Sequence, residues 1–214
     1  DVIIEAFSDS DEEYGSAQED ALAVIPHGDG AVAELNKADK TGFTAAHYAA
    51  NISVEILTQL YTHGAKIKKK TKKGLTPLMC AGSGETVRFL LSTEAVPVNT
   101  QDNEGNTAAH HLKGDSLDAL LESENLDLLI VNEDSETALF SAVRANSPES
   151  VRSLIEKGIN KNQRNKDGNT ALHVAARCGY NPTDIKSYPT TNAKEVVEEL
   201  LKPHAELELS LIHI

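Results

Sequence analysis

Apolar residues recur at positions i, i+3 and i+4 in five separate segments of the chain. This spacing places them on one face of a helix and predicts five helices that each bury one side. The apolar positions are Ile56, Leu57 and Leu60; Val87, Leu90 and Leu91; Leu117, Leu120 and Leu121; Val151, Leu154 and Ile155; and Val196, Val197, Leu200 and Leu201. Gly64 and Gly158 follow two of these segments, where the end of a helix favours a residue with positive φ.

A second pattern precedes each apolar segment. It reads GFTAAH from Gly42, GLTPLM from Gly74, GNTAAH from Gly105, SETALF from Ser135 and GNTALH from Gly168. The glycine suits a turn with positive φ, and the threonine that follows can cap a helix. The next residue is a good first helical residue, proline at 77 and alanine elsewhere. Each unit is therefore predicted to be a turn and two helices.

The threonines of this pattern are spaced by 32, 31, 30 and 33 residues. A period near 33 with a T-P-L-H-x-A core resembles the ankyrin repeat. The resemblance implies an all-α solenoid of stacked helix-turn-helix units with short β-hairpin finger loops, stabilised by stacking between neighbours. It also implies structural roles, including hydrogen bonds from the histidines that tie the turns together, for Gly42, Thr44, His47, Gly74, Thr76, Pro77, Gly105, Thr107, His110, Thr137, Gly168, Thr170 and His173.

The ankyrin repeat domain is predicted to span residues 19–208. A capping helix pair at 19–38 precedes repeats at about 39–70, 71–100, 101–131, 132–162 and 163–208. Repeats two and three lack about one helical turn between the threonine and the apolar ridge, so their helix pairs should be short or tilted. The fifth repeat contains an insertion at 181–191 whose prolines and turn formers predict a loop.

The two ends of the chain differ from the repeats. The first twenty residues contain eight acidic and no basic side chains, so residues 1–18 are predicted to be a disordered acidic tail, with Ser8 and Ser10 as candidate sites for an acidophilic kinase. Residues 204–209 resemble a link into a further repeat, and residues 209–214 look non-native. Since the chain also begins with Asp, we expect it to be a fragment of a longer protein.

Composition argues against several classes of function. A net charge of −13 opposes binding to nucleic acid. The sequence has no apolar run long enough to span a bilayer, and its first residues lack the pattern of a signal peptide. Cys80 and Cys178 form no disulfide framework and lie at no zinc-finger spacing, which predicts reduced thiols in the cytosol or nucleus. We also expect the chain to be a monomer in the cytoplasm. We expect no cofactor and no metal, because the extra histidine His111 has no second ligand at suitable spacing.

The sequence contains no phosphate loop, no acid and base pair in a pocket and no serine elbow. His173 lies near Cys178, but its structural role competes with activating a nucleophile. We therefore expect that the chain is not an enzyme.

The segment Lys66 to Lys73 contains six lysines in eight positions, and the resemblance places it on the finger between repeats one and two. Three interpretations remain open. It is a solvated loop, a docking patch for an acidic partner or for the chain's own acidic tail, or a nuclear import signal.

The resemblance implies a protein-interaction scaffold or adaptor that presents its finger loops and concave face to a protein partner. Phe43 and Leu75 are the expected anchors, because apolar side chains carry most of the energy of an interface. One alternative is a targeting or regulatory segment of a larger enzyme or channel. Another is an inhibitor whose acidic tail folds back over Lys66 to Lys73. The candidate partner-binding residues are Lys40, Phe43, Asn51, Lys72, Lys73, Leu75, Asn103, Glu104, Asn106, Glu133, Asp134, Glu136, Arg144, Lys166, Asp167, Asn169 and Arg177.

Overall fold

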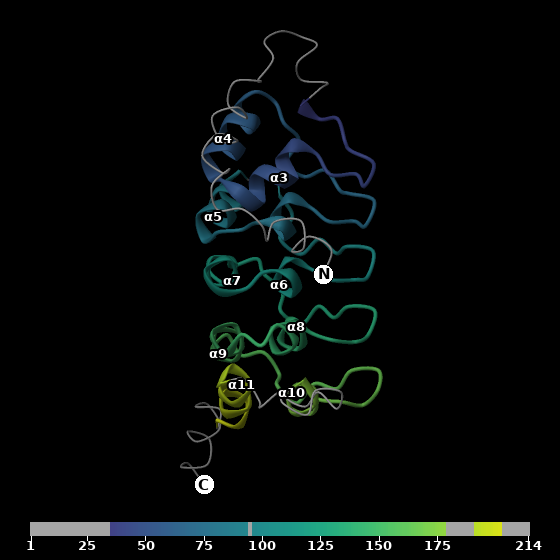
Figure 1. Ribbon diagram of the computed structural model, residues 1–214, viewed down its shortest axis with the longest axis vertical. Helices are drawn as coiled ribbons and strands as arrows, with labels where there is room; N and C mark the ends of the chain where they lie inside the picture. Colours follow the sequence, from purple (N-terminus) through teal and green to yellow (C-terminus); the bar gives the residue numbers. More distant parts are fainter. Residues whose placement is uncertain (1–34, 94–95, 179–190, 203–214) are drawn as a thin grey trace.

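The computed structural model describes residues 35–93, 96–178 and 191–202 (Figure 1). These residues form helices and turns, with no β-strand among them. The helices are α3 (Ala45–Ile52), α4 (Val54–Thr62), the 3-10 helix η1 (Pro77–Cys80), α5 (Gly84–Ser92), α6 (Ala108–His111), α7 (Gly114–Leu120), α8 (Ala138–Arg144), α9 (Pro148–Glu156), α10 (Ala171–Cys178) and α11 (Thr191–Leu201).

The helices stack in two columns that run the length of the molecule (Figure 1). The first helices of the repeats, α3, η1, α6, α8 and α10, contact one another in that order. The second helices, α4, α5, α7, α9 and α11, form the other column. The loops that lead into the first helices all project on one side of the stack, and we call them the fingers. The prediction of an all-α solenoid of stacked helix pairs is confirmed.

The core between the columns is mostly aliphatic and includes most residues of the predicted ridges, together with residues such as Leu78, Phe140 and Ile159. Leu57, Val87, Leu117 and Leu154 are fully buried. Leu201 was predicted to belong to the last ridge, but 62% of its side chain is exposed, because it ends α11 one position beyond the buried Leu200. Burial is therefore shared along the stack, as expected for units that have little core of their own.

Repeats two and three have short first helices, as the missing turn predicted. η1 and α6 each contain 4 residues, whereas α3 and α10 contain 8 and α8 contains 7. The turn is missing from the first helix in both repeats, because α5 retains 9 residues and α7 retains 7. The column of first helices is consequently indented at these two repeats.

Several predicted segments lie outside the described residues. They include the acidic tail 1–18 with Ser8 and Ser10, the cap at 19–38 up to residue 34, the insertion 181–191 up to residue 190, and the C-terminal residues 203–214. α11, which follows the insertion, packs against α9 and α10, as the second helix of a fifth repeat would.

Each finger is a turn in which a side-chain oxygen accepts hydrogen bonds from backbone amides of the same turn. In the first finger the Asp39 N–H donates to the Phe43 carbonyl over 2.8 Å, and the Asp39 carboxylate accepts from the amides of Thr41 and Phe43. Asp102, Asn132 and Asn165 hold the same position and accept the same pair of amides in fingers three to five, and Thr71 accepts one of them in finger two. Side chains therefore help to close the fingers, which form no strands.

Successive fingers are joined by main-chain hydrogen bonds. The tip amide of each finger donates to the tip carbonyl of the finger before it. The four pairs are Lys72 to Thr41 at 3.1 Å, Asn103 to Lys73 at 2.9 Å, Glu133 to Glu104 at 2.9 Å and Lys166 to Asp134 at 2.9 Å. We call this series the finger ladder.

The glycine at the tip is needed both for its φ and for its size. Gly42 has φ 93°, and a Cβ there would lie 2.5 Å from the Lys72 nitrogen of the next finger. Gly168 has a similar φ of 78°, but no described atom lies within 4 Å of a Cβ at that position. Ser135 takes the same role in finger four with φ 60°.

Replacement of Gly42 by alanine should lower the free energy of unfolding more than replacement of Gly168. Both changes strain a positive φ at a cost of about 1–2 kcal/mol, whereas only Gly42→Ala adds a collision with the next finger, at about 1–3 kcal/mol more. Urea unfolding of the two matched variants measures the difference. Equal losses would show that contact between fingers does not limit the residue at the tip.

Candidate partner-binding groove

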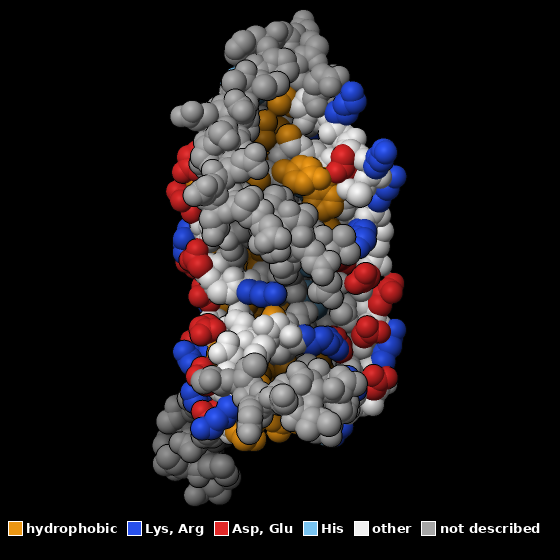
Figure 2. All heavy atoms as spheres, in the orientation of Figure 1, with side chains coloured by type: hydrophobic (Ala, Val, Ile, Leu, Met, Phe, Trp, Pro, Cys, Tyr) orange, Lys and Arg blue, Asp and Glu red, His pale blue; other side chains and the backbone are white. Residues whose placement is uncertain are grey.

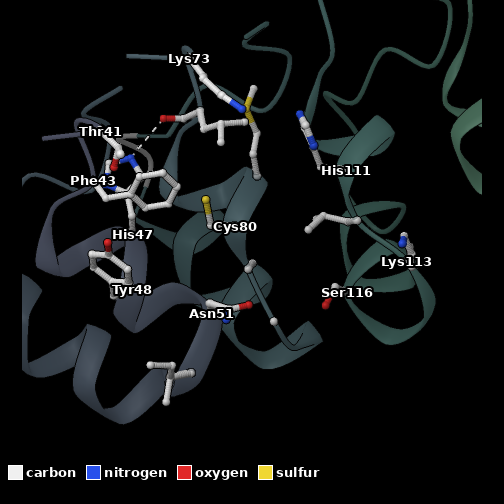
Figure 3. Close-up of a pocket in the computed structure, with 16 residues that line it drawn as sticks. Thr41, Phe43, His47, Tyr48, Asn51, Lys73, Cys80, His111, Lys113 and Ser116 are labelled. Carbon is white, nitrogen blue, oxygen red and sulfur yellow. Dashed lines mark hydrogen bonds between the residues drawn. The ribbon is translucent and has the colours of Figure 1, made fainter. Parts of the chain in front are cut away.

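The short first helices leave a groove on the face formed by the fingers and the first helices. After η1 the chain turns against the end of α3, where the Gly82 N–H donates to the Ala50 carbonyl over 3.0 Å. The last turn of α3 therefore extends beyond η1 and α6. The groove has a volume of about 650 Å³ and is lined by residues of repeats one, two and three (Figure 3).

The floor and one wall of the groove are apolar. Phe43, Tyr48 and Ile52 line it from the first repeat, and Leu75 and Leu112 line it from the next two. Tyr48 and Ile52 are large and exposed, with 48% and 52% of their surfaces accessible. Figure 2 shows hydrophobic side chains gathered on this face beside the basic fingers. An exposed apolar patch with polar groups at its edge is a feature of interaction sites.

Tyr48 is held in place by the first finger. Its hydroxyl donates to the Asp39 carboxylate over 2.7 Å, and its ring centroid lies 5.4 Å from that of Phe43. Hydrogen bonds from the hydroxyls of Thr41 and Tyr48 lower the pKa of Asp39, and the hydrogen bond to Asp39 raises the pKa of Tyr48. The exposed ring is therefore oriented before any partner binds.

His47, behind the groove, links the first repeat to the second. Its Nδ1 lies 3.2 Å from the Thr44 nitrogen and 2.9 Å from the Thr44 hydroxyl, and its Nε2 lies 3.1 Å from the Leu75 carbonyl (Figure 3). Because a carbonyl can only accept, Nε2 carries the proton and Nδ1 accepts. The neutral imidazole therefore forms hydrogen bonds both with Thr44 at the start of its own helix and with the Leu75 carbonyl of the next finger.

The same bridge occurs in the third repeat, and the contact within the repeat recurs in the fifth. His110 contacts Thr107 in its own repeat and the Glu136 carbonyl in the next, the latter over 3.0 Å. His173 lies 2.7 Å from the Thr170 hydroxyl. Repeats two and four have Met79 and Phe140 at this position, where neither side chain can donate a hydrogen bond to a carbonyl.

The consequence is visible in the threonines of repeats two and four. The Met79 sulfur accepts from the Thr76 amide over 3.4 Å, which is a weak contact. In repeat four the Thr137 hydroxyl is buried without a hydrogen-bond partner among the described residues. The histidine bridge thus holds together only some of the boundaries, while the finger ladder spans all of those described.

Four of the predicted partner-binding residues, Phe43, Asn51, Lys73 and Leu75, line the groove. Most of the others lie exposed along the finger edge and the first helices, outside the groove, with Asn106 and Asn169 half-buried. They are Lys40, Lys72, Asn103, Glu104, Asn106, Glu133, Asp134, Arg144, Lys166, Asp167, Asn169 and Arg177.

Glu136 does not lie on the partner-facing surface that the sequence suggested. It is 2% exposed, and its carboxylate accepts hydrogen bonds from the Arg144 guanidinium and the Asn165 amide. Burial alone would raise its pKa, but these two hydrogen bonds lower it overall. Glu136 therefore connects the fourth repeat to the fifth finger.

Tyr48 and Ile52 were missed as site residues. They lie four positions apart on α3, while Ala46, Ala49 and Ala50 of the same helix are buried. The sequence signal that could have identified them is this pair of large apolar residues on the face of the helix opposite the alanines.

The lysine-rich segment is partly built into the fold. Ile67 and Thr71 are buried, the Lys69 ammonium donates to the Asn36 carbonyl, and the Lys70 ammonium donates to the Gln101 carbonyl. Lys72 and Lys73 are exposed at the finger tip. Figure 2 shows basic side chains along the upper finger edge and more acidic ones further down.

The groove offers little reactive chemistry. Cys80 lines it, but burial raises the pKa of this thiol to about 12, so it is neutral at physiological pH. Among the described residues, no group of three or more histidine, cysteine, aspartate and glutamate side chains could hold a metal ion. Within the same residues no helix has the length and apolar character to cross a membrane.

A sequence model of the family described as ankyrin repeats (3 copies) matches residues 53–113 and 111–210. The chain belongs to the ankyrin repeat family. Ankyrin repeats are generally protein-interaction modules, which agrees with the non-reactive, apolar character of the groove.

This ankyrin repeat chain also resembles parts of much longer proteins. It is 29% identical to a putative ankyrin repeat protein of Acanthamoeba polyphaga mimivirus, over 66% of this chain and 18% of that protein. It is 35% identical to a probable serine/threonine-protein kinase of Dictyostelium discoideum, over 46% and 13%. It is 28% identical to the Homo sapiens transient receptor potential cation channel subfamily A member 1, over 68% and 14%. The chain thus spans less than a fifth of each of these relatives.

The histidine bridges predict a loss of stability in mild acid. Burial lowers the pKa of His47 and His110 in the folded chain, so below about pH 6.5 the unfolded chain binds protons that the folded chain does not. The free energy of unfolding should be greatest above that pH. As the pH falls further, it should decrease by up to about 1.4 kcal/mol per pH unit for each histidine. Urea unfolding at several pH values between 7.5 and 5.5 measures this slope.

The double variant His47→Gln/His110→Gln is the comparison. It should be less stable than the parent at pH 7.5 and lose less stability on acidification. Parallel pH profiles for the two proteins would contradict the assignment of the slope to these bridges.

Proposed function

We propose that this chain is a scaffold or adaptor that binds a segment of a protein partner in the groove between α3 and the short helices η1 and α6. The observation that carries the proposal is the exposed apolar surface of Tyr48 and Ile52 inside a hollow of about 650 Å³. A concave, mostly apolar surface with a few polar groups at its edge is the usual form of a binding site.

The shape and edges of the groove favour a polypeptide. Aromatic and aliphatic anchors that enter a pocket carry most of the energy of a protein interface. Phe43 and Leu75 lie at the base of fingers one and two, while Tyr48 and Ile52 lie on the exposed side of α3. A helix or an extended segment can contact both rows of anchors together.

Rigidity supports the same function. The finger ladder and the hydrogen bond from Tyr48 to Asp39 fix the groove's edge in the free chain. Less conformational entropy is then lost when a partner binds. We propose a cytoplasmic monomer, with nuclear import through Lys66 to Lys73 as a variant of the same proposal.

A second candidate is a targeting or regulatory segment of a larger protein. It is supported by the similarity to a probable kinase and to a cation channel, each of which is far longer than this chain. Both candidates use the groove for protein binding. They differ in whether the gene also encodes a catalytic or channel domain, which its complete open reading frame would reveal.

The double variant Tyr48→Asp/Ile52→Asp tests the groove. Both side chains are half exposed, so the fold should survive, while charges on the floor should weaken partner binding at least about tenfold, the effect of 1.4 kcal/mol. The parent and the variant are immobilised, and captured proteins are compared by quantitative mass spectrometry in a lysate of cells that express the chain. The most depleted partner is then titrated by calorimetry.

Leu129→Asp is the matched control, because Leu129 is 78% exposed and lies outside the groove. Its captured proteins should match those of the parent. Partners that bind parent, groove variant and control equally would exclude the groove as the binding site.

A further inference from the structure

The groove differs in charge from the rest of the chain. The whole sequence has a net charge of −13, yet among the described residues that line the groove there is no aspartate or glutamate. Lys73 lines it from the second finger, and His111 and Lys113 line it from the third repeat (Figure 3). In Figure 3 the Lys73 side chain reaches over the groove from the finger.

Two carboxylates beside the groove are already paired. Asp39 accepts from the Tyr48 hydroxyl over 2.7 Å, and Asp102 lies 2.7 Å from Nε2 of His111. Burial alone would raise the pKa of Asp102, but hydrogen bonds from His111 and from the amides of Asn106 and Glu104 lower it overall. Lys40 and Lys72 are exposed on the adjoining finger tips. The groove therefore favours a ligand that combines apolar side chains with negative charge.

The first twenty residues of the chain have this composition. They contain the apolar residues Val2, Ile3, Ile4 and Phe7 and eight acidic residues, with no lysine or arginine. Apolar side chains of this segment match the floor formed by Phe43, Tyr48 and Ile52, and its carboxylates match the lysines at the edge.

The segment is also long enough to reach the groove. The described chain begins beside the first repeat, where Leu35 is buried and the Asn36 side chain binds the Gly64 carbonyl and the Lys66 amide. The groove spans three repeats, whose helices lie about 8–10 Å apart, whereas residues 21–34 can extend over roughly 45 Å. A tether of this length holds a ligand at an effective concentration on the order of millimolar.

We propose that residues 1–20 occupy the groove of their own chain and that a protein partner must displace them. This inference rests on the proposed function of the groove. The consequence is self-inhibition, because the apparent affinity for a partner equals the intrinsic affinity multiplied by the fraction of chains whose groove is empty. It also selects partners that match or exceed the acidic and apolar character of the segment.

A single tryptophan reports the occupancy directly. The natural chain contains no tryptophan, so the variant Phe7→Trp has one emitter within the proposed ligand. The probe is compared in the full chain and in a synthetic peptide of residues 1–20. In the full chain its emission should shift to the blue, and its acrylamide quenching constant should be several-fold lower than in the peptide.

Second substitutions locate the contact. Ile52→Asp should restore the emission and quenching of the peptide, and so should Lys73→Glu, whose side chain is exposed. Leu129→Asp should leave the protected signal unchanged. Circular dichroism confirms that each variant keeps its helices. Salt at 1 M should increase quenching, because charge attraction is screened beyond about 3 Å.

Three results would overturn the proposal. In the first, the tryptophan of the full chain is quenched as readily as that of the peptide. In the second, the tryptophan stays protected from acrylamide in both groove variants, Ile52→Asp and Lys73→Glu. In the third, the protection depends on protein concentration, which would indicate a second copy of the chain as the occupant. Failure of this proposal can be distinguished from failure of the proposed function of the groove. If the tryptophan is exposed but Tyr48→Asp/Ile52→Asp still loses its captured partners, only the self-inhibition is rejected.

Discussion

The hydrogen bond from each finger tip to the tip before it sets the spacing and direction of the whole stack. It joins main-chain atoms, so it tolerates almost any side chain at the tip, and the described tips accordingly vary from lysine to glutamate. It requires only that the two backbones approach closely, and the lack of a Cβ at Gly42 permits that approach. Stability in such arrays is approximately the sum of unit and neighbour terms, so a contact that recurs between all five described fingers contributes to each neighbour term.

The groove depends on a departure from this regularity. Fingers one to three remain in register, but η1 and α6 are each one turn shorter than the first helices around them. The apolar residues at the end of α3 therefore face solvent instead of a neighbouring helix. The repeats give up packing at this point, and the uncovered surface becomes available to a ligand. The proposed binding site therefore lies where the array is least complete, in keeping with the usual trade between stability and activity.

The fold was predictable from the sequence because its signals are local and repeat five times. Turn glycines, capping threonines and apolar ridges each depend on a few neighbouring residues. The missing turn in repeats two and three was also visible as a shorter spacing.

The site was predictable only in part. Phe43 and Leu75 follow from their place beside the turn, but Glu136 has the same spacing and is buried, because Arg144 and Asn165 approach it from α8 and the fifth finger. The exposure of Tyr48 and Ile52 depends on where the chain turns after η1, which is a property of the next repeat. Spacing within one repeat does not contain that information.

Native-state hydrogen exchange at the finger tips shows whether the finger ladder joins neighbouring repeats. The side chains of Lys72, Asn103, Glu133 and Lys166 are exposed, but their amides donate to the preceding finger. We expect these four amides to exchange slowly, with protection close to that of the buried helices, because opening them separates neighbouring repeats. Exchange at the rate of an unstructured loop would contradict it, since the fingers would then move independently and could not hold the groove in shape.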